Sequence, residues 1–172
     1  MNKLVRILKH RWLDERDAQR AIGTDGLARL EARVTESERR HIGEIRVCVE
    51  SGLPLSYLWR DATARERAVA MFSKLRVWDT EFNSGVLIYL LLAEHRIEIV
   101  ADRGLNRHVS AQEWQQILEP MRAAFRAGQF EAGLNQAIDA VDALMLKYLA
   151  FGEGRGDAGS NPNELSNAPW VR

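Results

Sequence analysis

The alternation of apolar and polar residues predicts three strands in the middle of the chain. The segment EIRVCVE, residues 44–50, places isoleucine and valine on one face and is rich in β-branched residues, as strands are. Two later apolar runs, residues 86–93 and 96–102, are separated by only two residues. Such a short connection predicts an antiparallel hairpin.

Helical patterns surround these strands. The sequences TARE, beginning at Thr63, and SAQE, beginning at Ser110, are capping boxes, in which the first and fourth side chains each bond a free backbone amide of the other. Each therefore predicts a helix start. Pro120 predicts a kink or a break in the second of these helices, near Glu119. The 3.6-residue period predicts further helices over residues 14–22, 24–41 and 134–148.

The order of these elements predicts an α/β fold, a three-layer α/β/α sandwich with a small mixed β-sheet. The first strand, the helix after Thr63 and the second strand form a candidate right-handed crossover, which makes the two strands parallel. The hairpin then adds the third strand antiparallel to the second. The sheet therefore combines a parallel crossover with an antiparallel hairpin.

At 172 residues the chain is long enough for one domain with a substantial core. We expect an N-terminal basic, amphipathic helical segment over residues 1–23 and the folded domain over residues 24–151. Residues 152–172 are rich in Gly, Asn and Pro, which predicts a mobile tail. Its last four residues, PWVR, are a candidate docking element.

Composition narrows the classes of partner. Lys plus Arg and Asp plus Glu both number 24, so no global field gathers nucleic acid, and no nucleic-acid partner is expected. The single cysteine, Cys48, excludes an internal disulfide and a cysteine-cluster zinc site. The four histidines lack metal-site spacing and are expected at the surface. No signal peptide or membrane span is predicted, so we expect a soluble, cytoplasmic protein.

The first helix-like segment, residues 3–12, has two interpretations. Leu4, Ile7, Leu8 and Trp12 recur at helical spacing among cations, which is the composition of a helix that lies on a membrane surface. The alternative is a helix that packs on the domain by its apolar side. The first interpretation predicts weak membrane-surface association at the inner face of the membrane.

Oxygen-bearing side chains stand at alternate positions in the loop before the second strand. In a hairpin the end of one strand lies beside the start of the other, so Asp102 should emerge beside this loop. Carboxylate and amide oxygens are what Ca²⁺ or Mg²⁺ binds. The spacing is not that of an EF-hand, and a hydrogen-bonded turn is the alternative. The predicted metal ligands are Asp79, Glu81, Asn83 and Asp102.

The same edge of the sheet carries a candidate rim for an anion or a partner, formed by Arg103, Asn106 and Ser110. The predicted helix start at Ser110 offers backbone amides, which suit an anion. The sequence contains no nucleophile elbow, P-loop or dinucleotide fingerprint, so we expect no organic cofactor. Catalytic residues stay unassigned.

The order of motifs over residues 43–149 resembles the TPM-domain family. An apolar helix is followed by VWDTEF, an Asn-Ser-Gly step into VLI, the hairpin, and a Gly-Leu pair. A later proline and GQFEAG precede the last helix. The chain has Asn83-Ser84-Gly85 where Asp-Asn-Gly is common in the family, and Asn106 where a glutamate is common.

The resemblance implies a compact α/β/α domain of a cytoplasmic bacterial branch. Family members are typically secreted, lumenal or membrane-tethered, and one acts in photosystem II repair in the thylakoid lumen. Calcium binding and a weak acid-phosphatase activity have been attributed to the family. Three hypotheses follow: a binding module for an unknown protein partner, aided by a divalent cation near the membrane; a weak metal-dependent acid phosphatase; and a peripheral-membrane scaffold.

Overall fold

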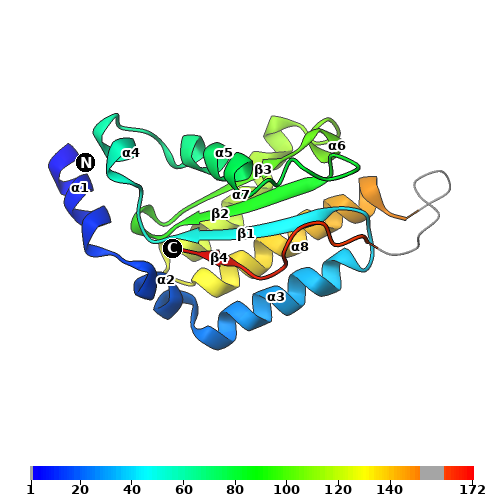
Figure 1. Cartoon of the computed structure of the whole chain (residues 1–172), viewed down its shortest axis with the longest axis horizontal. Helices are drawn as coiled ribbons and strands as arrows, with labels where there is room; N and C mark the ends of the chain where they lie inside the picture. Colours follow the sequence, from blue (N-terminus) through cyan, green and yellow to red (C-terminus); the bar gives the residue numbers. More distant parts are fainter. Residues whose placement is uncertain (1, 152–160) are drawn as a thin grey trace.

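The computed structural model describes residues 2–151 and 161–172, in which a four-stranded sheet lies between helical layers (Figure 1). The strand order is β3-β2-β1-β4. β1 pairs in parallel with β2 and β4, whereas β2 pairs antiparallel with β3. The predicted parallel crossover and antiparallel hairpin are thus confirmed. The strands are β1 (Glu44–Glu50), β2 (Gly85–Leu91), β3 (Arg96–Ala101) and β4 (Trp170–Val171).

The helices begin where the capping boxes predict. The side chains of Thr63 and Ser110 both accept from the amide three residues later, and the glutamate there bonds back. One short helix, α4, lies between β1 and α5, in a stretch for which the sequence pattern predicts no helix. The helices are α1 (Lys3–Trp12), α2 (Glu15–Ile22), α3 (Thr24–Glu38), α4 (Leu55–Trp59), α5 (Ala64–Lys74), η1 (Leu92–Glu94), α6 (Arg103–Asn106), α7 (Ala111–Arg126) and α8 (Phe130–Leu149).

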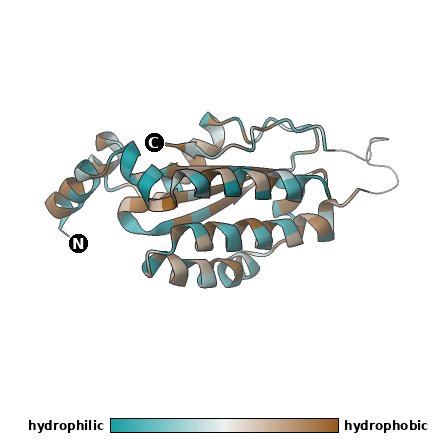
Figure 2. Cartoon of the chain, turned by 90° about the horizontal axis from the view of Figure 1, so that it is seen from below, coloured by the Kyte–Doolittle hydropathy of each residue, from teal (hydrophilic) through white to brown (hydrophobic). Residues whose placement is uncertain are grey.

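The sheet is buried on both faces, which gives three layers. Ile45, Val47 and Val49 of β1 face a core beneath α2, α3, α7 and α8. Cys48 of the same strand faces a second core beneath α4 and α5. Every residue of β2 is buried, as expected for a central strand covered on both sides. Figure 2 views the lower layer from outside, where hydrophilic residues recur along its helices.

Pro120 does not break its helix. α7 runs without interruption from Ala111 to Arg126, with Pro120 inside it. Pro120 and Gln116, whose carbonyl loses its usual amide partner, both lie on the exposed side of the helix. Water can therefore bond the freed carbonyl, which is why the predicted break is wrong.

The end of the chain lies along the sheet. Residues 152–160 fall outside the described part, but the prediction of a mobile tail does not hold for residues 161–172. The Glu44 carboxylate accepts from the amides of Glu164 and Leu165, at 3.1 and 3.2 Å. The docking of PWVR is confirmed, because its Trp170 and Val171 form β4. The charged side chain of Glu44 in β1 thus bonds backbone amides that are far away in sequence. No local sequence pattern predicts such a pairing.

Candidate functional site

The hairpin brings Asp102 beside the loop of residues 79–84, as predicted. The amide of Asp102 donates to the carbonyl of Gly85 at 2.9 Å, and the amide of Gly104 donates to the carbonyl of Asn83 at 2.8 Å. A Cβ atom at Gly104 would stand 2.5 Å from the Asn83 carbonyl oxygen, so only glycine allows this approach. We call the set Asn83, Asp102 and Arg103 the rim site.

Asn83 and Arg103 join the two segments. Asn83 has a positive φ of 51°, a conformation that asparagine tolerates better than most residues. Its side-chain oxygen accepts from Nη2 of Arg103 at 2.8 Å. The Arg103 side chain is otherwise 85% exposed. An exposed cationic side chain therefore bonds the loop without being buried by it.

Asp102 caps the short helix α6. Its Oδ1 atom accepts from the amide of Arg103 at 2.7 Å, and the Arg103 Nε lies 3.8 Å from the same oxygen. Its Oδ2 atom is buried and has no hydrogen-bond partner among the described residues. One oxygen thus serves the turn, whereas the other has no partner among the described residues and belongs to a side chain that is 11% exposed.

The Asp79 carboxylate and the backbone amide of Glu81 are bonded to other residues. Asp79 pairs with Nη2 of Arg76 at 2.7 Å, and both side chains are exposed. The amide of Glu81 donates to the Glu164 carboxylate at 3.0 Å, so a residue from the C-terminal segment enters the loop. Within the described residues, no group of three or more His, Cys, Asp or Glu side chains is placed to hold a metal ion. Cation binding at this edge stays a prediction.

The remaining predicted residues, Asn106 and Ser110, hold the start of α7. The Asn106 side-chain oxygen accepts from the Trp114 indole nitrogen at 3.3 Å. Ser110 and Glu113 cap each other, and hydrogen bonds from Ser110 lower the pKa of the Glu113 carboxyl. An ionised carboxylate at this helix start opposes a second anion there. The amides of Ser110 and Glu113 are thus already bonded within the capping box.

Comparison with known proteins agrees with the motifs and the fold. The family model described as the TPM domain matches residues 16–144. The chain belongs to the TPM-domain family. No curated protein matches the sequence.

Two solved structures share the fold of this TPM domain. The NMR structure of the BA42 protein from the psychrophilic bacterium Bizionia argentinensis is 24% identical, with a TM-score of 0.70 over 87% of this chain and 94% of that one. The N-terminal domain of a protein from P. gingivalis is 18% identical, with a TM-score of 0.61 over 76% and 82%. At these identities the likeness establishes the fold alone.

The TPM domain also contains a buried cluster that resembles a catalytic triad. Ser37 Oγ lies 3.1 Å from His41 Nε2 and donates to Asp142 Oδ1 at 2.7 Å. All three side chains are buried, and burial lowers the pKa of His41. Because Ser37 and His41, the residues that would act as nucleophile and base, are 3% and 0% exposed, the cluster is structural. The expectation of surface histidines is wrong for His41 and for His10, which is 4% exposed.

Cys48 is equally unsuited to catalysis. It is fully buried, and burial raises the pKa of its thiol well above the ordinary value. The thiolate that nucleophilic chemistry requires is therefore disfavoured. Within residues 2–151 and 161–172, no helix combines the length and the apolar character needed to cross a bilayer.

Proposed function

We propose that this TPM domain is a binding module that recognises a protein partner at the rim site, aided by a divalent cation, Ca²⁺ or Mg²⁺. The observation that carries the proposal is the unpaired Oδ2 atom of Asp102. Leaving a buried polar atom unpaired costs about 1–3 kcal/mol, and more for a charged group. A cation or a donor from a partner recovers that free energy.

The other unpaired buried atoms of the described chain have an explanation within the fold. They are Glu38 Oε2 and Asn167 Oδ1. These side chains contact each other, and burial raises the pKa of Glu38 to about 8. A protonated Glu38 supplies the donor that both oxygens need. Asp102 has no comparable neighbour, which distinguishes the rim site.

Arg103 supports a cation as the ligand of the rim site. Its guanidinium bonds Asn83 and lies near Asp102, so it provides positive charge beside both oxygens. Its side chain is 85% exposed and can be displaced at little cost. A metal ion, or a lysine or arginine of a partner, would compete for the same oxygens.

Calorimetric titration with Ca²⁺ and with Mg²⁺ tests the metal component. We expect the substitution Asp102→Asn to weaken binding about tenfold or more, because it removes a ligand charge. Arg103→Ala should strengthen binding by removing the competing cation. Asp25→Asn, which neutralises an exposed carboxylate on α3, is the control and should leave binding unchanged. Absence of heat and of a melting-temperature shift with both ions would remove the metal from the proposal.

A weak metal-dependent acid phosphatase is the second candidate. It is supported by Asp102 and Arg103 side by side, because a carboxylate would hold the cation and an arginine a phosphoryl oxygen. Phosphate release from a generic ester should then fall in Asp102→Asn and stay unchanged in Asp79→Asn, because the Asp79 carboxylate pairs with Arg76. Equal rates in both variants and the unchanged protein would contradict this candidate.

We also propose that the module works in the cytoplasm. The support is its single cysteine, Cys48, a usage typical of reducing compartments. Fractionation of native host cells, with marker proteins for each compartment, tests the location. Recovery with the exported markers would contradict it.

A further inference from the structure

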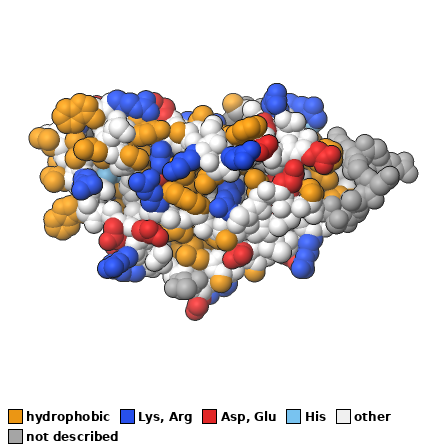
Figure 3. All heavy atoms as spheres, viewed as in Figure 1, with side chains coloured by type: hydrophobic (Ala, Val, Ile, Leu, Met, Phe, Trp, Pro, Cys, Tyr) orange, Lys and Arg blue, Asp and Glu red, His pale blue; other side chains and the backbone are white. Residues whose placement is uncertain are grey.

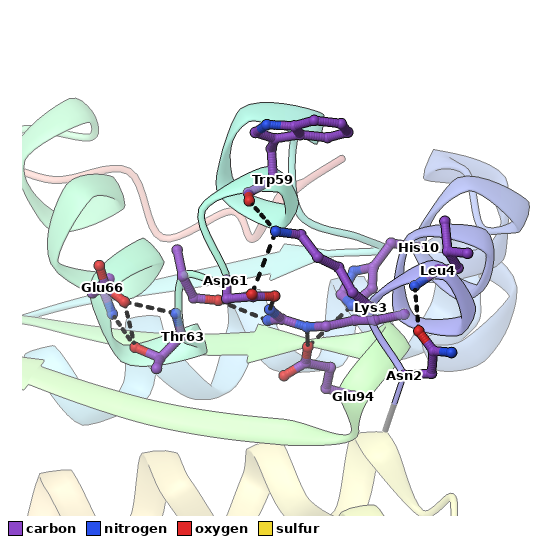
Figure 4. A network of polar contacts seen from close by, with 11 residues as sticks. Asn2, Lys3, Leu4, His10, Trp59, Asp61, Thr63, Glu66 and Glu94 are labelled. Carbon is purple, nitrogen blue, oxygen red and sulfur yellow. Dashed lines mark hydrogen bonds and ion pairs between the residues drawn. The ribbon is translucent and has the colours of Figure 1, made fainter.

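Helix α1 faces the protein with its polar side. Nε of Arg6 donates to the Glu94 carboxylate at 2.8 Å, and its Nη2 donates to the carbonyl of Ala62 at 2.7 Å. His10 Nε2 lies 3.1 Å from the same carboxylate, and its Nδ1 accepts from the amide of Leu53 at 2.9 Å. Figure 4 shows His10 and Glu94 within this network between α1 and the loop after α4.

These contacts fix the rotation of the helix. Hydrogen bonds from His10, and then from Arg6, lower the pKa of Glu94 to about 2, so this carboxylate stays ionised at every ordinary pH. Lys3 adds an ion pair with Asp61 at 3.4 Å. A helix held by its polar side must turn its other side away from the protein.

The side turned outward is apolar. Leu4, Val5, Leu8 and Trp12 are exposed by 69%, 53%, 59% and 85%. At about 100° per residue, these side chains occupy an arc of about 100°, the width of a stripe that ordinarily faces a core. Only Ile7 packs against the sheet, in the core beneath α4 and α5. The prediction that the helix packs by its apolar side is therefore wrong for the main stripe.

Helix α4 extends the apolar surface. Its Leu55 and Trp59 are 54% and 71% exposed, and the Lys3 ammonium lies 5.6 Å from the centre of the Trp59 ring. Six of the eight large apolar side chains exposed in the described chain belong to α1 and α4. Figure 3 shows hydrophobic side chains gathered at the end of the molecule that carries α1. Such a concentration marks an interaction surface.

A groove runs behind this stripe. It has a volume of about 890 Å³ and is lined by Val5, Leu8, Trp12, Leu92 and Phe130, among others. Its walls are mostly apolar, so a groove of this kind accepts an alkyl chain more readily than a polar peptide. The apolar surface at this end of the molecule therefore includes a groove as well as the exposed stripe of α1.

The charged residues of α1 indicate which kind of partner binds this apolar surface. Within Lys3–Trp12 there is no acidic residue, and Lys9 and Arg11 lie on the two sides of the apolar stripe. Both are exposed, and neither forms an ion pair within the described residues. Two copies meeting through this surface would bring equal charges together. An anionic headgroup layer instead complements the cations, while the acyl region receives the apolar stripe.

We propose that the end of the molecule formed by α1 and α4 docks on an anionic lipid bilayer. Leu4, Leu8 and Trp12 enter the boundary between headgroups and acyl chains, where tryptophan is favoured. Lys9 and Arg11 contact the lipid phosphates and carboxylates. α1 lies at one end of the long axis and α6 toward the other (Figure 1), so the docked protein presents the rim site away from the membrane. This docking requires neither a metal nor the rim site.

Vesicle co-sedimentation of the full chain tests the proposal. The vesicles are phosphatidylcholine alone and phosphatidylcholine mixed with phosphatidylserine, each at low and at high salt. We expect binding to the mixed vesicles, weakened by salt. Trp12→Ser should reduce it about tenfold or more, from the apolar area lost. Lys9→Gln with Arg11→Gln should reduce it by about twentyfold or more at low salt.

Trp78→Ser is the matched control, because Trp78 is also exposed, by 49%, but lies outside the docking surface. It should bind vesicles like the unchanged protein. All altered side chains point outward, so the melting temperatures should agree. Absence of binding to mixed vesicles at low salt would overturn the proposal. So would equal losses in the Trp12 and Trp78 variants, or concentration-dependent dimers abolished by Trp12→Ser without vesicle binding.

Discussion

Glu38, at the end of α3, is a buried carboxyl that the fold holds in its protonated form. Its Oε1 atom accepts from the amide of Ile45 at 2.7 Å, and the residue is only 3% exposed. Burial is the largest cause that raises its pKa to about 8, with nearby Glu44 adding to the shift. A single side chain thereby couples the stability of this domain to pH.

The substitution Glu38→Gln should stabilise the protein above neutral pH. Between about pH 4.5 and 8 the folded state holds a proton that the unfolded state has released. The free energy of unfolding therefore falls as pH rises through this range. Glutamine keeps the acceptor for Ile45 and stays neutral, so the variant should lose this dependence.

Chemical denaturation of both proteins from pH 5 to pH 9 measures the effect. The difference in unfolding free energy should grow with pH up to about 8 and then level off. His41 also titrates with folding, but it is common to both proteins and cancels in the difference. Parallel pH profiles would show that Glu38 ionises normally in the fold.

At the scale of elements, the C-terminal segment completes the sheet. β4 covers the edge of β1, which would otherwise present unpaired backbone groups to other chains. Arg46 of β1 supports this by donating through Nη1 to the carbonyls of Ser166 and Ala168, the latter at 2.8 Å. A strand of only two residues thus depends on side chains from its neighbour.

Arg46→Ala should destabilise the protein by about 1–3 kcal/mol, because it removes the partner of two backbone carbonyls. Arg39→Ala is a suitable comparison, since Arg39 forms only an exposed ion pair with Glu36. That change should stay within about 0.5 kcal/mol. Denaturation midpoints measure both, and equal effects would mean that the segment is held without Arg46.

At the scale of the whole molecule, two different surfaces stand at opposite ends of the long axis. The chain has no net charge, yet α1 contains basic residues and no acidic residue. The rim site instead contains a carboxylate oxygen that is buried and unpaired among the described residues. Under the two proposals the molecule acts as an adaptor, with one end for a lipid surface and the other for a cation or a partner.

The two ends should act independently, because widely separated sites without shared contacts contribute additively. Asp102→Asn should leave vesicle binding unchanged, and Trp12→Ser should leave the calorimetric response to Ca²⁺ unchanged. The double variant should show both losses and nothing more. A Ca²⁺-dependent change in vesicle binding that Asp102→Asn abolishes would contradict independence.

The predictions that succeeded are those set by neighbours in sequence. The capping boxes at Thr63 and Ser110 and the two-residue hairpin connection follow from hydrogen bonds and turns among residues a few positions apart. The hairpin in turn placed Asp102 beside Asn83, because antiparallel pairing fixes which strand ends meet. All three residues of the rim site were thus candidates from the sequence, whereas the hydrogen bond from Arg103 to Asn83 was not predicted.

The sequence by itself determined the elements apart from short ones such as α4, α6 and β4, the pairing within the crossover and hairpin, and the apolar stripe of α1. Only the tertiary structure decided that Arg6 and His10 bind Glu94 and turn that stripe outward, that Asp79 pairs away from the rim, and that the chain end pairs with β1. The physical reason is the range of the interactions. Periodicity and caps are read over a few residues, whereas the choice between a buried and an exposed face depends on distant groups that compete for the same hydrogen bonds.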